Sequence, residues 1–290
     1  MLLSTDGTRV LTGTKDGSIW SLTPDGGQVR RVAHTGGRPL GLEWLPDGRL
    51  LVCDADAGLL AVDLPSGRIE ELLTEVDGVR LRFTNNAAVA DDGTIYVSDS
   101  SRHYGVEEWK SDLIAHTRTG RLLRRSPDGT VTTLLGGLAF ANGVALTPDG
   151  SQVWVAETAL SRIRRLDLQG RELGRIDGLA GYPDNIALGS DGLIWVALAA
   201  PPDPVLGLLQ GRGAPLRPLA LRLPEALKPT PKRTVRVAAF DASGLQRHDI
   251  SVDAARWHMA TGVREHDGAI WLGSLVEPAL AVLETDGGPR

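Results

Sequence analysis

The sequence repeats a pattern that residues 85–99, NNAAVADDGTIYVSD, show clearly. The pattern returns as NGVALTPDGSQVWVAE at 142–157 and as DNIALGSDGLIWVAL at 184–198. Each copy holds a short apolar run, an Asp-Gly pair and a second apolar run. This arrangement is typical of two β-strands joined by a tight turn.

The Asp-Gly pair marks a repeat that covers the whole chain. Among the Asp-Gly pairs of the chain, those that serve as the repeat marker are Asp6-Gly7, Asp47-Gly48, Asp92-Gly93, Asp149-Gly150, Asp191-Gly192 and Asp267-Gly268, each followed by a short apolar run. The first intervals are 41 and 45 residues, which is the length of a four-stranded propeller blade. We therefore predict an all-β fold in which residues 1–290 form one six-bladed β-propeller. Its blades are antiparallel, and insertions near 102–118 and 201–234 add a small helical or loop cap.

One position within the repeat carries oxygen-bearing side chains in three blades. Asn85, Asn142 and Asp184 each stand seven residues before the Asp of their marker, at the start of the blade's first strand. First strands line the channel of a propeller, so these side chains should meet at one mouth of it. Oxygen ligands suit a hard cation such as Ca²⁺, with Zn²⁺, Mn²⁺ or Mg²⁺ as alternatives. The competing reading is that Asn and Asp make local turns.

The other blades fill this position differently. It is Leu40 in the second blade and Ala260 in the sixth, and in the first blade it falls before Met1. The sixth blade also offers only three strand-like segments. We therefore expect the native protein to begin upstream of Met1 and to supply both a ligand position and a closing strand.

Composition excludes several classes of function. The 290 residues carry a net charge of −5, which gives no electrostatic basis for binding nucleic acid. The single cysteine, Cys53, suits a reducing compartment. Residues 1–20 lack the features of a signal peptide, so we expect a cytoplasmic protein. The sequence leaves its oligomeric state open.

The repeats resemble a known family. FTNNAAVADDGTIYVSDSS, FANGVALTPDGSQVWVAET, GYPDNIALGSDGLIWVAL and VREHDGAIWLGSL are similar to the strictosidine synthase-like branch of the gluconolactonase/regucalcin and paraoxonase superfamily. The resemblance implies a six-bladed propeller with a channel calcium. Its ligands would be Asn85, Asn142, Asp184 and a Glu that would precede Met1.

The resemblance also has limits. Where this chain has Asn85-Asn86, the family often has Asn-Asp, and in paraoxonases that Asp helps to hold a second calcium. Strictosidine synthase has a catalytic Glu where this chain has Thr261, which argues against condensation of an amine with an aldehyde. The paraoxonase catalytic histidine corresponds to Asp54.

The expected chemistry is metal-assisted hydrolysis of a lactone or ester. A cation polarises the carbonyl and a carboxylate activates water, and we assign Asp184 as ligand and catalytic base. A non-enzymatic propeller that binds calcium or a partner is the alternative. Further candidates for outer-shell or pocket roles are Asn185, Asn86, Asp54, Asp99, His103 and His258. For the aspartates and histidines the competing reading is a structural or solvated side chain.

The segment 201–234 interrupts the repeat. It alternates leucines with arginines and lysines, and its prolines break any long helix. We expect it to pack over the channel mouth and shape the substrate pocket. Contact with membrane lipids is the alternative.

Overall fold

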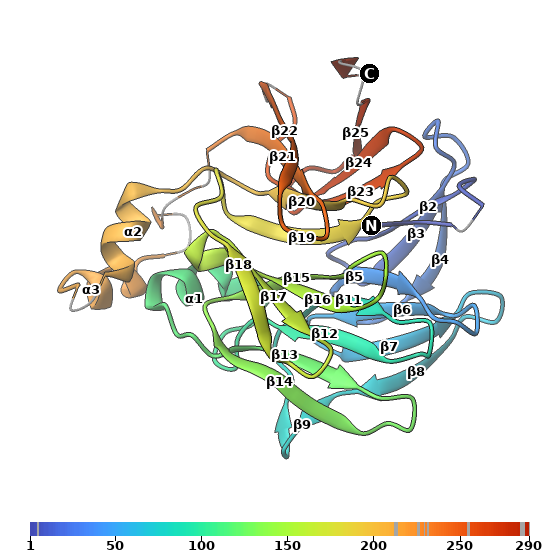
Figure 1. Cartoon of the computed structure of the whole chain (residues 1–290), viewed down its shortest axis with the longest axis horizontal. Coiled ribbons are helices and arrows are strands. Elements are labelled where there is room, and N and C mark those ends of the chain that lie inside the picture. The colour runs from blue at the N-terminus through green and yellow to red at the C-terminus, as the bar shows by residue number, and fades with distance from the viewer. Residues whose placement is uncertain are drawn as a thin grey trace.

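The computed structural model describes residues 1–4, 6–211, 214–224, 227–228, 230, 232–253, 256–284 and 288–289. Six four-stranded antiparallel sheets are arranged as the blades of a propeller (Figure 1). The predicted fold class is therefore confirmed. Each Asp-Gly marker lies between the first and second strand of its blade.

The blades follow one another along the chain. The first comprises β1 (Leu2–Leu3), β2 (Val10–Gly13), β3 (Ser18–Leu22) and β4 (Arg30–His34). The second comprises β5 (Pro39–Trp44), β6 (Leu50–Asp54), β7 (Gly58–Asp63) and β8 (Arg68–Leu73). The third comprises β11 (Thr84–Val89), β12 (Ile95–Asp99), β13 (Gly120–Arg125) and β14 (Val131–Leu138). A small hairpin, β9 (Glu75–Val76) and β10 (Val79–Arg80), precedes the third blade.

The second half repeats this order. The fourth blade comprises β15 (Ala141–Leu146), β16 (Gln152–Glu157), β17 (Arg162–Asp167) and β18 (Glu172–Ile176). The fifth comprises β19 (Pro183–Leu188), β20 (Ile194–Leu198), β21 (Thr234–Phe240) and β22 (Gln246–Asp253). The sixth comprises β23 (Ala260–His266), β24 (Ala269–Ser274), β25 (Ala281–Glu284) and β26 (Gly288–Pro289).

The sixth blade corrects one expectation. Its fourth strand is β26, which pairs antiparallel with β25 through Leu283 and Glu284. The prediction that this strand is missing is wrong, because a two-residue Gly-Pro strand has no apolar alternation and both residues are disfavoured in sheets.

Apolar packing between neighbouring blades holds the ring together. Trp154 of the fourth blade packs with Ile194 and Phe240 of the fifth, and all three side chains are almost completely buried. Equivalent clusters join the other neighbouring blades. The cluster between the first and sixth blades is smaller, with Leu3, Val10 and Trp271 as its buried members. Burial of apolar area on both faces of each blade is the main stabilising contribution.

Two insertions stand at the same end of the propeller. The first joins β12 to β13 and contains a 3₁₀ turn (Val106–Glu108) and α1 (Trp109–Ala115). The second joins β20 to β21 and contains α2 (Pro204–Gln210) and α3 (Arg217–Arg222). These helices pack on one another at one side of the ring (Figure 1). A further 3₁₀ turn, Thr158–Leu160, follows β16. No helix among the described residues is long and apolar enough to cross a membrane.

Candidate functional site

A β-bulge in the first strand of the third, fourth and fifth blades positions the predicted ligands. In the third blade the pairs Thr84–Asp99 and Ala87–Val97 flank the bulge, so Asn85 and Asn86 face one residue of β12. The same interruption places Asn142 in β15 and Asp184 in β19. A bulge re-aims a side chain that regular pairing would direct elsewhere. The first bulge residue of each of these strands lines one cavity.

The sixth blade requires a second correction. Its Asp-Gly turn is tighter, because His266 pairs directly with Ala269. The bulge therefore falls on Thr261, between the pairs Ala260–Ser274 and Gly262–Gly273. Thr261 lines the cavity, whereas Ala260 is completely buried. The equivalent of Asn85 in this blade is thus Thr261 and not Ala260.

Hydroxyl groups fix the orientation of both asparagines. The Asn85 Nδ2 donates to Ser100 Oγ at 2.8 Å, and Ser100 Oγ donates to the carbonyl of Ala141 in the next blade at 2.6 Å. The Asn142 Nδ2 donates to Thr158 Oγ1 at 3.1 Å, which donates to the Pro183 carbonyl at 2.7 Å. Each amide nitrogen is thereby occupied, and each amide oxygen is left for the channel.

Asp184 has no such hydroxyl partner in the part of the chain that the structure describes. The residue that follows its second strand is Ala199, where the other two blades have Ser100 and Thr158. Burial raises the pKa of Asp184 to about 7, although hydrogen bonds from the Asn142 side chain and the Asn185 backbone act in the opposite direction. A partly buried carboxylate without a cationic partner is electrostatically costly.

These residues fit a divalent cation. The Asn142 Oδ1 is buried and has no hydrogen-bond partner in the described structure. Two amide oxygens and one carboxylate form a donor set that suits calcium. No group of three or more His, Cys, Asp and Glu residues forms a metal site among the described residues, so the amide oxygens are essential to this interpretation.

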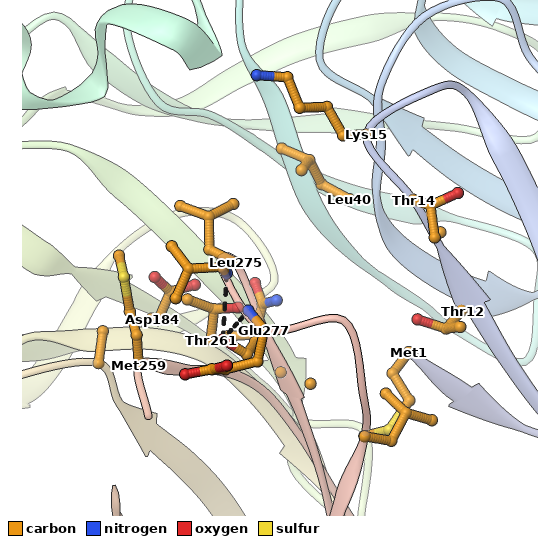
Figure 2. Close-up of a pocket in the computed structure, with 18 of the residues that line it drawn as sticks. Met1, Thr12, Thr14, Lys15, Leu40, Asp184, Met259, Thr261, Leu275 and Glu277 are labelled. Carbon is orange, nitrogen blue, oxygen red and sulfur yellow. Dashed lines mark hydrogen bonds between the residues drawn. The ribbon is translucent and has the colours of Figure 1, made fainter. Parts of the chain in front are cut away.

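The cavity above these residues has a volume of about 980 Å³. Figure 2 shows Asp184, Met259, Thr261 and Glu277 on one side of it and Leu40 and Lys15 on the other. Its wall near the cap is apolar and aromatic. It includes Phe83, Val106, Trp109, Leu113, Phe140 and Tyr182.

Several other predicted residues have structural roles. The Asn86 Oδ1 accepts a hydrogen bond from Val144 N of the next blade at 2.9 Å. Asp54 is fully buried, and its Oδ1 accepts from the backbone of Arg38, Asp56 and Ala57. Asp99 forms an ion pair with Arg121 at 3.0 Å, and burial raises its pKa. None of Asn86, Asp54 and Asp99 lines the cavity.

The remaining candidates divide into two groups. Asn185 lines the cavity, and its buried Oδ1 has no hydrogen-bond partner in the described structure. His103 is exposed and does not line the cavity. His258 lies behind the cavity wall, where its Nδ1 contacts Glu277 Oε1.

Sequence reasoning missed the hydroxyl relays and Glu277. Ser100 and Thr158 each directly follow the second strand of their blade, and these are the two blades whose bulge residue is Asn. This co-occurrence in the sequence could have predicted the relays. Glu277 lines the cavity from the loop after β24 and also approaches Arg233 at 3.4 Å. No repeat position marks it.

The relay makes a testable prediction at Thr158. Thr158→Val should leave the buried Asn142 amide without its acceptor, so that Oδ1 is no longer held toward the cavity. We expect calcium affinity to fall about 10–100-fold, as for other groups that orient metal ligands. Stability should fall by about 1–3 kcal/mol. Calorimetric titration of calcium measures the first effect.

Two further variants act as controls. Thr158→Ser keeps the hydroxyl and should retain the affinity. Thr132→Val, at an exposed position of β14, should change neither quantity. Unchanged calcium affinity in a folded Thr158→Val protein would show that the relay does not orient Asn142 for a cation.

Comparisons with known proteins agree with this architecture. Residues 5–202 match the SMP-30/Gluconolactonase/LRE-like region family. The adipocyte plasma membrane-associated protein of Salmo salar is 32% identical over 96% of this chain and 73% of its own length. The strictosidine synthase-like 10 protein of Arabidopsis thaliana is 34% identical over 87% of this chain and 71% of its own. The chain therefore belongs to the SMP-30/gluconolactonase family, as its resemblance implied.

Solved structures share the fold at low sequence identity. A gluconolactonase from Xanthomonas campestris has a TM-score of 0.66 and 16% identity, covering 95% of this chain and 82% of the other. A calcium-binding regucalcin from Agrobacterium tumefaciens has a TM-score of 0.64 and 15% identity, covering 95% and 82%. At this identity the likeness establishes the propeller fold.

Proposed function

We propose that this chain is a calcium-dependent hydrolase of lactones or esters. The observation that carries the proposal is the set of bulge residues Asn85, Asn142 and Asp184, which line one cavity with both amide oxygens freed by hydroxyl relays. Family membership supports it, since structurally similar proteins include a gluconolactonase and a calcium-binding regucalcin.

Each residue has a distinct role in the proposed reaction. Asn85, Asn142 and Asp184 hold the cation, which, when bound, supplies an electrophile for the substrate carbonyl oxygen. The Asp184 carboxylate, which the bound cation keeps ionised, accepts a proton from the attacking water. The apolar wall formed by Phe83, Phe140 and Tyr182 restricts access of other water.

Two other functions are less well supported. Condensation of the strictosidine synthase type requires a carboxylate at the start of the last blade, where this chain has Thr261. A non-enzymatic propeller that binds calcium or a partner agrees with the fold as well as a hydrolase does, because fold alone does not determine function.

A panel of lactones and esters tests the proposal. We expect turnover of at least one member that disappears after chelation and returns with Ca²⁺, with Zn²⁺, Mn²⁺ and Mg²⁺ assayed in parallel. Calcium binding without any turnover across the panel would favour the binding propeller. Full turnover by the chelated protein would refute the metal mechanism.

A further inference from the structure

The cap carries several large apolar side chains that are exposed. Exposed fractions are 55% for Val205 and 77% for Leu208 in α2, and 65% for Leu216 and 62% for Leu219 at α3. Leu227, which follows α3, is 66% exposed. Other large exposed apolar residues, such as Leu173, Leu188 and Leu245, lie outside the cap, in the fourth and fifth blades. We call the five residues of the cap the outer leucine face.

The opposite sides of the same helices are packed. Leu206 and Leu209 of α2 are buried against the cluster that contains Phe83, Phe140 and Ile114, and Ala220 and Leu221 of α3 contact that cluster. Residues three apart on a helix share one side, so burial of one side fixes the outer leucine face toward solvent. The cap helices therefore carry apolar side chains on their exposed side as well as on their packed side.

Hydrogen bonds hold the cap in this orientation. Arg217 donates from Nε to the Leu209 carbonyl and from an Nη to the Gly211 carbonyl, both at 2.7 Å, which joins α3 to the end of α2. Lys228 Nζ donates to Ser111 Oγ of α1 at 2.7 Å. Asp203 accepts from the Val205 and Leu206 backbone and caps α2. The exposed leucines thus belong to a packed element.

The charge of the segment is opposite to that of the chain. Residues 201–234 contain six Arg and Lys residues but only two acids, Asp203 and Glu225, whereas the whole chain has a net charge of −5. Arg222, in α3, and Lys232 are exposed residues of the same segment. Apolar side chains flanked by basic ones complement a lipid surface that presents anionic headgroups.

We propose that the outer leucine face docks on the surface of an anionic lipid bilayer. A second copy of the chain is a poorer occupant, because a two-fold contact places the same basic residues opposite one another. The cap also packs against Phe83 and Phe140, which line the cavity, so the docked surface belongs to the element that forms part of the cavity wall. The proposal does not depend on the proposed reaction, because it concerns a different surface.

Vesicle co-sedimentation tests the docking. The wild-type chain should pellet with phosphatidylcholine vesicles that contain phosphatidylserine, and less with phosphatidylcholine alone. Leu208→Ser combined with Leu219→Ser should weaken binding about tenfold or more, since both variants remove apolar area from the contact. Leu173→Ser combined with Leu245→Ser removes two exposed leucines elsewhere and should bind as the wild type does.

Two further measurements test the role of charge and the state of assembly. Arg222→Glu combined with Lys232→Glu should remove the preference for phosphatidylserine. Melting curves establish that each variant is folded. Absence of pelleting with either vesicle, or equal binding by the two leucine variants, would overturn the proposal. Analytical ultracentrifugation tests the other occupant. A dimer that the Leu208→Ser, Leu219→Ser variant abolishes, together with no vesicle binding, would also overturn the proposal and would identify the face as an interface between copies.

Discussion

Replacing Asp184 with alanine should lower metal-dependent turnover at least about a thousandfold, because one change removes a cation ligand and the proposed base. The fold should survive, since the Asp184 carboxylate carries a cost of burial that alanine removes. The measurement is kcat/KM on the best substrate of the panel, with circular dichroism as the check on folding.

A carboxylate elsewhere in the same cavity gives the matched control. Asp25 also lines it, at an exposed turn between β3 and β4, and Asp25→Ala should retain activity within a few-fold. If Asp184→Ala and Asp25→Ala have the same activity as the wild type, Asp184 is not part of the reaction.

The second large effect is on stability as a function of pH. Burial raises the pKa of Asp184 in the folded, metal-free protein to about 7, from its usual value of 3.8. The folded state therefore binds this proton more tightly than the unfolded state. The contribution of Asp184 to stability falls as pH rises from about 4 to about 7, and the full penalty, about 2–4 kcal/mol, is present above pH 7.

Asp184→Asn isolates this effect because it removes the titrating group at nearly constant volume. Urea unfolding in the presence of a chelator should show the variant gaining stability over the wild type as pH rises from 4 to 8. Calcium should reverse the difference above pH 7, since the cation compensates the carboxylate and stabilises the state that binds it. A difference between the two proteins that does not change with pH would contradict the proposed burial of Asp184.

Much of the architecture follows from local sequence. The Asp-Gly turns and short apolar runs define the first two strands of each blade, because turn chemistry and alternation are local properties. The constant offset of Asn85, Asn142 and Asp184 also identified side chains that share one cavity. Repetition made these predictions possible, since equivalent positions in a ring occupy equivalent places.

The predictions that were wrong or incomplete depended on strand register or on contacts between blades. Thr261 was missed as the sixth-blade equivalent of Asn85, because a tighter turn moved the bulge by one residue relative to the Asp-Gly marker. The Ser100 and Thr158 relays end on carbonyls of the next blade, and such contacts have no signature within one repeat. Asp54 and Asp99 each end a second strand, which made them candidates for the site. Their carboxylates instead accept hydrogen bonds from the backbone of Arg38 and the side chain of Arg121.

The cap shows a further limit of sequence reasoning. The alternation of leucines with basic residues and the break in the repeat led us to predict that 201–234 packs over the channel mouth, and Leu206 and Leu209 pack with Phe83 and Phe140, which line the cavity. Alternation alone did not reveal that Leu208 and Leu219 face solvent, because the sides of a short helix are distinguished only by what the helix packs against.

A crystal structure of the protein grown with calcium tests the central claim most directly. The account predicts one ion at the channel mouth, with side-chain oxygens of Asn85, Asn142 and Asp184 within about 2.3–2.6 Å of it. The Asn85 and Asn142 amide nitrogens should still face Ser100 and Thr158. Calcium bound elsewhere, with these three oxygens outside its coordination sphere, would contradict the account.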